Sequence, residues 1–224
     1  RKAEVFLAET FCPQVREGLS AELGLPANLY IDKEDKQTVI FAYPNLFSDA
    51  STLQVIRLKI GALAAWTPAQ LVDIVPYSAE QYPKLFKQKE VSVLTVAPER
   101  TFWEKATILH HEANRPKHLS MPQRYSRHYY DLYCMSKSPV KEKAFAQLSL
   151  LQKVVDFKMK FYPRAWAHYP EAVPATLKLL PPSYRLSALQ EDYSAMRNML
   201  YGEIPSFETM MEAVGELEKE IHAL

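Results

Sequence analysis

The sequence predicts an α+β fold, with strands in its first half and a helical bundle after them. Short runs rich in β-branched and aromatic residues, separated by polar turns, recur between residues 28 and 96. From Pro98 onward the apolar residues recur instead at helical spacing. Strands that come before helices, without alternating with them, are typical of the α+β class. We therefore expect antiparallel or mixed strands in a partial α/β region over residues 1–97, and a helical domain over residues 98–224.

The first region begins with a predicted helix and continues as strands. Apolar residues recur at helical spacing over residues 3–23, Pro13 marks a kink, and Gly24 and Pro26 end the helix. The predicted strands are 28–32, 37–43, 53–63, 71–75 and 91–96. The spacing of the first three predicts an antiparallel meander. Between the last two, the pattern from Ser78 to Gln81 predicts a capping box at the start of a short helix.

Two helices joined by a basic loop follow Pro98. The first is predicted to end near Arg115, because Pro116 disfavours helical geometry in the residue before it. The second extends to about Met135 and has Arg124, Arg127 and Asp131 on one face, where an Arg and an Asp one turn apart can pair. Further helices are predicted over 139–162, 186–201 and 206–223, with a proline-rich, partly helical stretch over 164–179.

The loop between the two helices concentrates positive charge in a chain whose formal net charge is only +1. Between Ala113 and His128 there is no Asp or Glu, and the basic side chains are Arg115, Lys117, His118, Arg124, Arg127 and His128. A patch of this kind is typical of a phosphate-binding surface. For each residue taken singly, the alternative is an ordinary solvated helix face.

Lys105 stands apart because Trp103, Glu104 and an apolar stripe surround it in the helical pattern, which predicts partial burial. A lysine withdrawn from water needs an anion beside it. The structural alternative is an ion pair with one of the acidic residues of the same helix, Glu99, Glu104 or Glu112. The functional alternative is a nucleotide triphosphate, for which lysine is a common point-charge ligand.

Composition excludes several classes of protein. With only five Gly, the chain contains neither a G-x-G-x-x-G nor a G-x-x-x-x-G-K-[ST] motif. No apolar run is long enough to span a membrane, and no secretory signal is present. Cys12 and Cys134 make no metal-binding motif, which predicts free thiols in a reducing cytoplasm. The spacing of His110, His111 and Glu112 does not match that of a zinc protease helix.

Two runs of sequence resemble a known family. They are ERTFWEKATILH, residues 99–110, and RYSRHYYDLY, residues 124–133, and both are similar to the AbiEii/AbiGii toxin family of nucleotidyltransferases. The upstream run QTVIFAYP, residues 37–44, and the strand 57–61 also look like that family. The resemblance spans roughly residues 30 to 135, and the rest of the chain matches only as a generic helical extension.

The resemblance implies a polymerase-β-like nucleotidyltransferase, the toxin of a bacterial toxin–antitoxin or abortive infection system. Members are thought to transfer a nucleoside monophosphate from an NTP to an acceptor, which for some members is tRNA. The implied partners are therefore NTP, tRNA or another RNA, and a cognate antitoxin, and the implied cofactor in the full-length protein is Mg²⁺, clamped by carboxylates.

The resemblance also implies roles for particular residues. Lys105 and Asp131 are the implied catalytic residues. The implied nucleotide-binding residues are Lys105, Arg127, Glu99, Glu104 and Trp103. The implied RNA or phosphate patch consists of Arg115, Lys117, Arg124 and His128.

The sequence departs from the family pattern in two places. The catalytic signature of the family, a Gly-Gly/Ser turn followed by paired acidic residues on a strand, does not occur in residues 1–36, where Asp32 and Asp35 lie in turn sequence. Lys59 stands where relatives usually carry Glu. Because the chain begins with Arg1 in helical sequence, we expect it to be a piece of a longer protein and to be inactive by itself. The alternative hypothesis is a non-catalytic module that binds RNA or an antitoxin.

Overall fold

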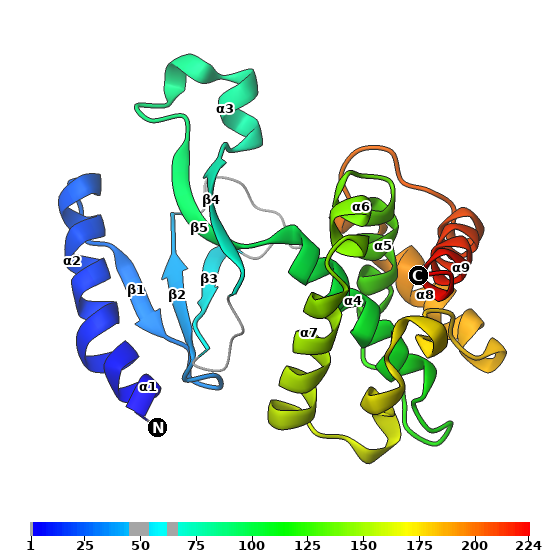
Figure 1. The fold of residues 1–224 in the computed structure, drawn as a ribbon. Coiled ribbons are helices and arrows are strands. Elements are labelled where there is room, and N and C mark those ends of the chain that lie inside the picture. The colour runs from blue at the N-terminus through cyan, green and yellow to red at the C-terminus, as the bar shows by residue number, and fades with distance from the viewer. Residues whose placement is uncertain (1, 45–53, 62–66) are drawn as a thin grey trace. The chain divides into compact units, whose positions relative to one another are not determined.

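The computed structural model describes residues 2–44, 54–61 and 67–224 (Figure 1). These residues divide into two compact units, Arg1–Ala64 and Ala65–Leu224. Antiparallel strands come early in the chain and helices follow, so the predicted α+β class is confirmed. The predicted domain boundary between Ala97 and Pro98 stays a prediction.

A helix with one irregular turn opens the first unit. α1 (Lys2–Phe6) continues through a π-helical turn (Leu7–Phe11) into α2 (Cys12–Leu23). The irregular turn ends two residues before Pro13, whose missing N–H cannot bond the carbonyl four residues earlier, that of Glu9. Gly24 ends α2 at a φ of 65°, a left-handed conformation that glycine adopts at little cost.

The sheet of the first unit is the predicted meander. β1 (Asn28–Ile31), β2 (Thr38–Ala42) and β3 (Val55–Lys59) pair antiparallel in that order. The ends predicted at Leu53 and Leu63 lie outside the described residues. The core of this unit joins the helix to the sheet through Leu7, Cys12, Leu29 and Val39. Arg16 of α2 reinforces this contact, since its Nε donates to the Leu29 carbonyl at 2.9 Å.

The second unit starts with a hairpin arm, which we define as residues 69–96. In it β4 (Ala69–Ile74) pairs antiparallel with β5 (Val91–Val96), and the chain between them forms α3 (Tyr77–Gln81) and a 3₁₀ turn (Pro83–Leu85). The predicted capping box is wrong. Pro76, in an extended conformation, is the N-cap of α3, so Ser78 lies inside the helix and makes no capping bond.

The remaining chain is helical. Its helices are α4 (Pro98–Ala113), α5 (Ser126–Ser136), α6 (Val140–Phe145), α7 (Leu148–Phe161), α8 (Leu186–Ala195) and α9 (Phe207–His222). Short 3₁₀ turns occupy Ala165–Ala167, Tyr169–Glu171, Pro174–Thr176, Ser183–Arg185 and Arg197–Met199. The single helix predicted over 139–162 is two helices, because Gln147 leaves helical geometry and lets α6 and α7 each pack against α4.

α4 is the central helix of this unit and packs against α5, α6 and α7 (Figure 1). The apolar stripe predicted on it lies in the core, and Trp103, on another face, is also fully buried. The indole Nε1 of Trp103 donates to the Ala144 carbonyl of α6 at 3.2 Å. A helix buried on several faces is held firmly, so α4 is a rigid base for the side chains that leave the core. Across the described parts of the chain, none of the helices has both the length and the apolar character that a membrane span requires.

Candidate functional site

Lys105 and Asp131 form an ion pair between α4 and α5. The Nζ of Lys105 donates to Oδ2 of Asp131 at 2.6 Å. The exposed fractions of the two side chains are 21% and 40%, so a ligand in solvent can reach the pair. The partner of Lys105 thus lies on the neighbouring helix. Asp131 makes this contact in place of the pairing with Arg127 that helical spacing allows.

The acidic residues of α4 do not pair with Lys105. The Oε1 of Glu104 accepts from Nε of Arg100 at 2.9 Å, and Glu112 accepts two bonds from the Arg115 guanidinium at 2.7 and 2.8 Å. Glu99 is buried in the first turn, where the helix dipole favours a negative charge. The predicted structural alternative for Lys105, a pair with Glu99, Glu104 or Glu112, is therefore wrong in its partner, although right in expecting a carboxylate.

His128 is the second partner of Lys105, with 3.3 Å between its Nδ1 and Nζ of the lysine. A lysine ammonium group has no acceptor, so Nδ1 accepts and the proton of the neutral ring is on Nε2. Burial, together with the positive charges of Lys105 and Arg127, lowers the pKa of His128 to about 3. His128 is buried and neutral, so it adds no positive charge to the predicted basic patch.

Lys158 of α7 lies next to Lys105, and no sequence motif predicted it as a site residue. Its Nζ donates to the Glu104 carbonyl at 3.1 Å, 54 residues away in sequence. Burial lowers the pKa of Lys158 to about 7; the charge of Glu104 opposes this shift and that of Lys105 adds to it. A lysine in the last turn of an amphipathic helix is common, so no local signal distinguished it.

A cavity of about 380 Å³ opens beside Asp131, and we call it the Arg127 cavity. Its lining residues are Tyr77, Arg124, Arg127, Tyr130, Asp131, Met196, Met199, Leu200 and Tyr201. Arg124, Arg127 and Asp131 therefore share one wall, as predicted. The prediction that all three lie on one helix is wrong for Arg124, which precedes α5 in a left-handed conformation. Two further lining residues, Tyr77 and Tyr201, come from outside α5 and carry no motif in the sequence that predicted them.

Asp192 of α8 holds the turn that presents the two arginines. Its Oδ1 accepts from the backbone N–H of Arg124 at 2.6 Å, and its Oδ2 accepts from that of Ser126 at 2.9 Å. The hydroxyl of Ser126 donates to the same carboxylate. Arg124 has a φ of 59°, which is uncommon for a residue other than glycine, and these bonds offset the cost of that conformation.

The predicted basic patch is not one continuous surface. Arg115 is neutralised by Glu112, lies over the Trp166 ring at 4.8 Å and has a side chain only 12% exposed, so it is a structural residue. Lys117 is exposed and lies over the Tyr184 ring. Trp103 likewise leaves the predicted nucleotide site, since a fully buried ring has no surface for a nucleotide.

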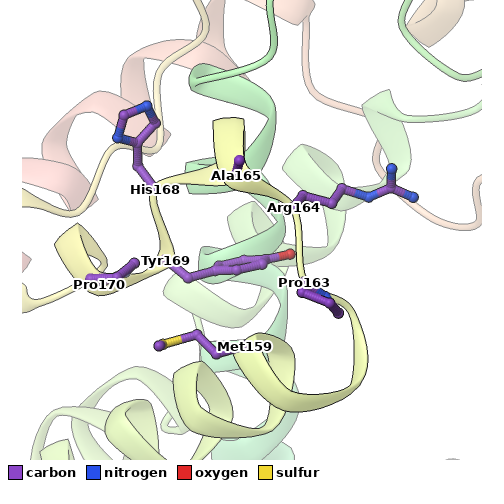
Figure 2. A pocket seen from close by; sticks show the side chains of 7 residues that line it. All are labelled: Met159, Pro163, Arg164, Ala165, His168, Tyr169 and Pro170. Carbon is purple, nitrogen blue, oxygen red and sulfur yellow. The ribbon is translucent and has the colours of Figure 1, made fainter.

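A separate cavity of about 300 Å³ lies near the end of α7 (Figure 2). Figure 2 shows the Tyr169 ring in its centre, near Met159, while the side chains of Arg164 and His168 extend away from that ring. His168 is paired with Glu171 at 2.9 Å. Because its two nitrogen-bearing side chains are turned outward, this cavity has an apolar centre and is a poor site for phosphate.

The first unit contains the acidic residues considered for metal binding. Oδ2 of Asp32 accepts from Nη2 of Arg57 at 2.6 Å, and Lys59 lies 3.3 Å from Oδ2 of Asp35. Lys59 therefore has a local ion-pair partner on the meander. Among residues 2–44, 54–61 and 67–224, no three His, Cys, Asp or Glu side chains are grouped so as to hold a metal ion. Carboxylates engaged by Arg and Lys do not fit Mg²⁺, which requires free oxygen ligands.

Comparison with known proteins adds one finding. A family model described as "Nucleotidyl transferase AbiEii toxin, Type IV TA system" matches residues 9–213. The match extends well beyond residues 30–135, the part in which individual motifs were recognised, and it includes both Lys105 and Asp131. No curated protein and no solved structure matches the chain.

Proposed function

The chain belongs to the AbiEii family of nucleotidyl transferase toxins of type IV toxin–antitoxin systems, and from this premise we propose that Lys105 grips the triphosphate of an NTP. The nucleoside monophosphate of that NTP is transferred to an RNA acceptor such as tRNA. The observation that carries the proposal is the Lys105–Asp131 pair, partly exposed, beside a cavity lined by Arg127. The cognate antitoxin is the proposed protein partner.

The hydrogen bonds of Lys105 support this role. An ammonium group has three N–H donors, and those of Lys105 are directed at Asp131 and His128 within the protein. These two acceptors fix the position of Nζ and leave a third donor for a phosphate oxygen. A cation held in place before its ligand arrives loses little freedom on binding, which favours phosphate affinity.

The charges around Lys105 also favour an anion. Asp131 balances one positive charge, His128 is neutral, and Arg127 supplies a further exposed guanidinium on the same cavity wall. A triphosphate brings the negative charge that this group lacks. Glu99 and Glu104 contribute through α4, by helix-dipole stabilisation and by the pair with Arg100, rather than by contact with the nucleotide.

Nucleotidyltransferases of this kind generally use NTP with a divalent metal, and we propose Mg²⁺. The contribution that we assign to the described residues is the binding and positioning of the triphosphate. We also propose that residues 98–224, which contain Lys105, Arg127 and Asp131, act as the nucleotide-gripping domain, and that residues 1–97 are a part of the nucleotidyltransferase region.

The test is the variant Lys105→Met in the intact protein, which keeps an unbranched side chain one atom shorter and removes the charge. We expect loss of toxicity in growing bacteria and a weakening of NTP binding by about 10- to 100-fold, the effect of losing a hydrogen bond to a charged group. Calorimetric titration with NTP measures the second effect. Lys153→Met is the matched control, because Lys153 is an exposed lysine on α7.

Full toxicity of Lys105→Met, with Lys153→Met also toxic, would remove Lys105 from the mechanism. If instead the intact protein binds RNA in a salt-sensitive manner and has no affinity for NTP, the alternative of a non-catalytic binding module replaces the transferase proposal.

A further inference from the structure

Two tyrosines at the rim of the Arg127 cavity are stacked on each other yet largely exposed. The rings of Tyr77 and Tyr201 have centroids 4.7 Å apart at an interplanar angle of 18°. The exposed fractions of the two residues are 66% and 70%. Each ring has one face against the other, so the outer faces are open to solvent. Aromatic rings presented in this way gain little from burial and are suited to stack on a planar ligand.

The two exposed arginines of the cavity lie on the same wall as these rings. Arg124 and Arg127 line it together with the tyrosines, and neither guanidinium has an ion-pair partner within the described residues. Asp131, the acidic residue of this wall, is already paired with Lys105. The cavity therefore combines open aromatic faces with positive charge that is available for phosphate.

A second cavity continues from the first. It has a volume of about 710 Å³ and shares Arg124, Met196 and Met199 with the Arg127 cavity. Its acidic residues are Glu191, which is exposed, and Asp192, whose oxygens accept the bonds from Arg124 and Ser126. Methionine side chains adapt their shape to irregular apolar surfaces such as base edges. Two cavities that share a wall make a groove longer than a single nucleotide requires.

We propose that this tyrosine–arginine groove, formed by the two cavities, binds a single-stranded segment of the RNA acceptor. A base stacks on the outer face of the Tyr77–Tyr201 pair, and a neighbouring phosphate pairs with Arg124, the arginine that lines both cavities. Only an unpaired base exposes the face that such stacking needs, so a strand end or loop binds and a duplex does not. The inference rests on the proposed function in taking RNA as the acceptor.

The position of Asp131 connects the groove to the proposed chemistry. Asp131 lines the Arg127 cavity and holds Lys105, so a strand in the groove lies next to the lysine that grips the triphosphate. Acceptor and nucleotide then occupy neighbouring positions, divided by the Lys105–Asp131 pair.

The experiment measures the binding of a fluorescein-labelled RNA of eight uridines to the full chain by fluorescence anisotropy, without NTP. Stacking on one ring predicts that Tyr201→Ala weakens binding by about tenfold or more, and that Tyr77→Ala has an effect in the same direction. Tyr201→Phe keeps the ring and should bind like the wild type. Tyr82→Ala is the matched control, an exposed tyrosine of the same hairpin arm that does not line the groove.

Salt dependence tests the arginines. Each phosphate contact of a single strand contributes about 0.7 to the slope of the logarithm of affinity against the logarithm of salt concentration. Arg124→Ala should lower this slope by about that amount, whereas Arg127→Ala, at the arginine assigned to the nucleotide, should lower it less. Lys153→Ala, an exposed charge on α7, should leave the slope unchanged.

Two further arms separate the possible outcomes. Unlabelled UTP should not displace the octanucleotide. If it does, and if Tyr201→Ala loses UTP binding to the same extent, the tyrosines bind the free nucleotide and the inference is overturned. A blunt duplex of the same length that binds as tightly would also overturn it. If Tyr201→Ala binds the octanucleotide like the wild type while Lys105→Met abolishes toxicity, the groove assignment fails and the proposed function stands. If Lys105→Met stays toxic, the proposed function fails whatever the octanucleotide does.

Discussion

At the scale of single residues, the site consists of basic side chains packed unusually close together. Lys105, His128 and Lys158 converge from three helices. Asp131 is the carboxylate paired with Lys105. Like charges at such distances repel, and the site limits the repulsion by keeping His128 neutral and lowering the pKa of Lys158 to about 7. Perturbed groups of this kind gather at functional sites, because an arriving anion relieves the repulsion.

The shifted pKa of Lys158 predicts how stability depends on pH. Its pKa is about 7 in the folded chain and 10.5 as an ordinary lysine. Below about pH 7 both states bind the proton and the folded state carries the full cost of burying the charge. Above that pH the unfolded state binds more protons, so the free energy of unfolding attributable to this group rises until the unfolded lysine also loses its proton.

Replacing Lys158 by Met removes this dependence. Relative to Lys158→Met, the wild type should gain stability between about pH 7 and about pH 10.5, the pKa values of Lys158 in the folded and unfolded chain, because the folded state sheds the buried charge over that window. Urea unfolding of both proteins across the window measures the difference. If the free energy of unfolding of the wild type and of Lys158→Met varies with pH in the same way, Lys158 titrates as an ordinary lysine. The control Lys153→Met, at an exposed position of the same helix, should show the same pH dependence as the wild type.

At the scale of elements, α5 depends on another helix for its first turn. Its N-cap residue, Tyr125, makes no side-chain capping bond. Asp192 of α8 supplies the missing acceptor, as a carboxylate that faces the backbone N–H groups of Arg124 and Ser126. The arginines of the cavity therefore depend on a contact between two helices distant in sequence.

Asp192→Ala should accordingly destabilise the protein. We expect a loss of about 1–3 kcal/mol in the free energy of unfolding, because two backbone donors and the Ser126 hydroxyl lose their acceptor. Asp192→Asn, which retains one carbonyl oxygen, should lose less. Chemical denaturation measures both effects. Glu191→Ala is the neighbouring exposed control and should change stability by less than about 0.5 kcal/mol; an equal effect at the two positions would contradict the capping role.

At the scale of the whole molecule, the residues that the structure describes form two cores. Leu7, Cys12, Leu29 and Val39 form the core of the first unit, while the core of the second is built around α4. Each set is buried within its own unit, so the hydrophobic stabilisation of one does not require residues of the other.

This separation predicts that damage to one core stays local. Leu29→Ala should cost the first unit about 2–5 kcal/mol, the usual effect of deleting a buried leucine side chain. Hydrogen exchange read by mass spectrometry should then show lost protection in β1 and β2 with α9 unchanged. An equal loss of protection in α9 would show that the two units unfold as one.

The local pattern of the sequence determined the elements of this protein. The meander, the helix over Pro98–Ala113 and the irregular turn before Pro13 follow from alternation, helical periodicity and proline chemistry, which act over a few residues. The failures at this level are also local: Pro76 displaced the predicted capping box, and Gln147 divided a predicted helix. The motif residues around Lys105 and Asp131 identified the family that the match over residues 9–213 confirms.

The tertiary structure alone decided which charges are available for chemistry. The sequence grouped Arg115, His128 and Arg127 as equivalent basic residues, yet packing neutralised Arg115 with Glu112, buried His128 beside Lys105 and left Arg127 in an open cavity. It also brought Lys158 and the Tyr77–Tyr201 stack to the site from distant elements. The physical reason is that helix and strand preferences depend on near neighbours in sequence, while burial and ion pairing depend on neighbours in space.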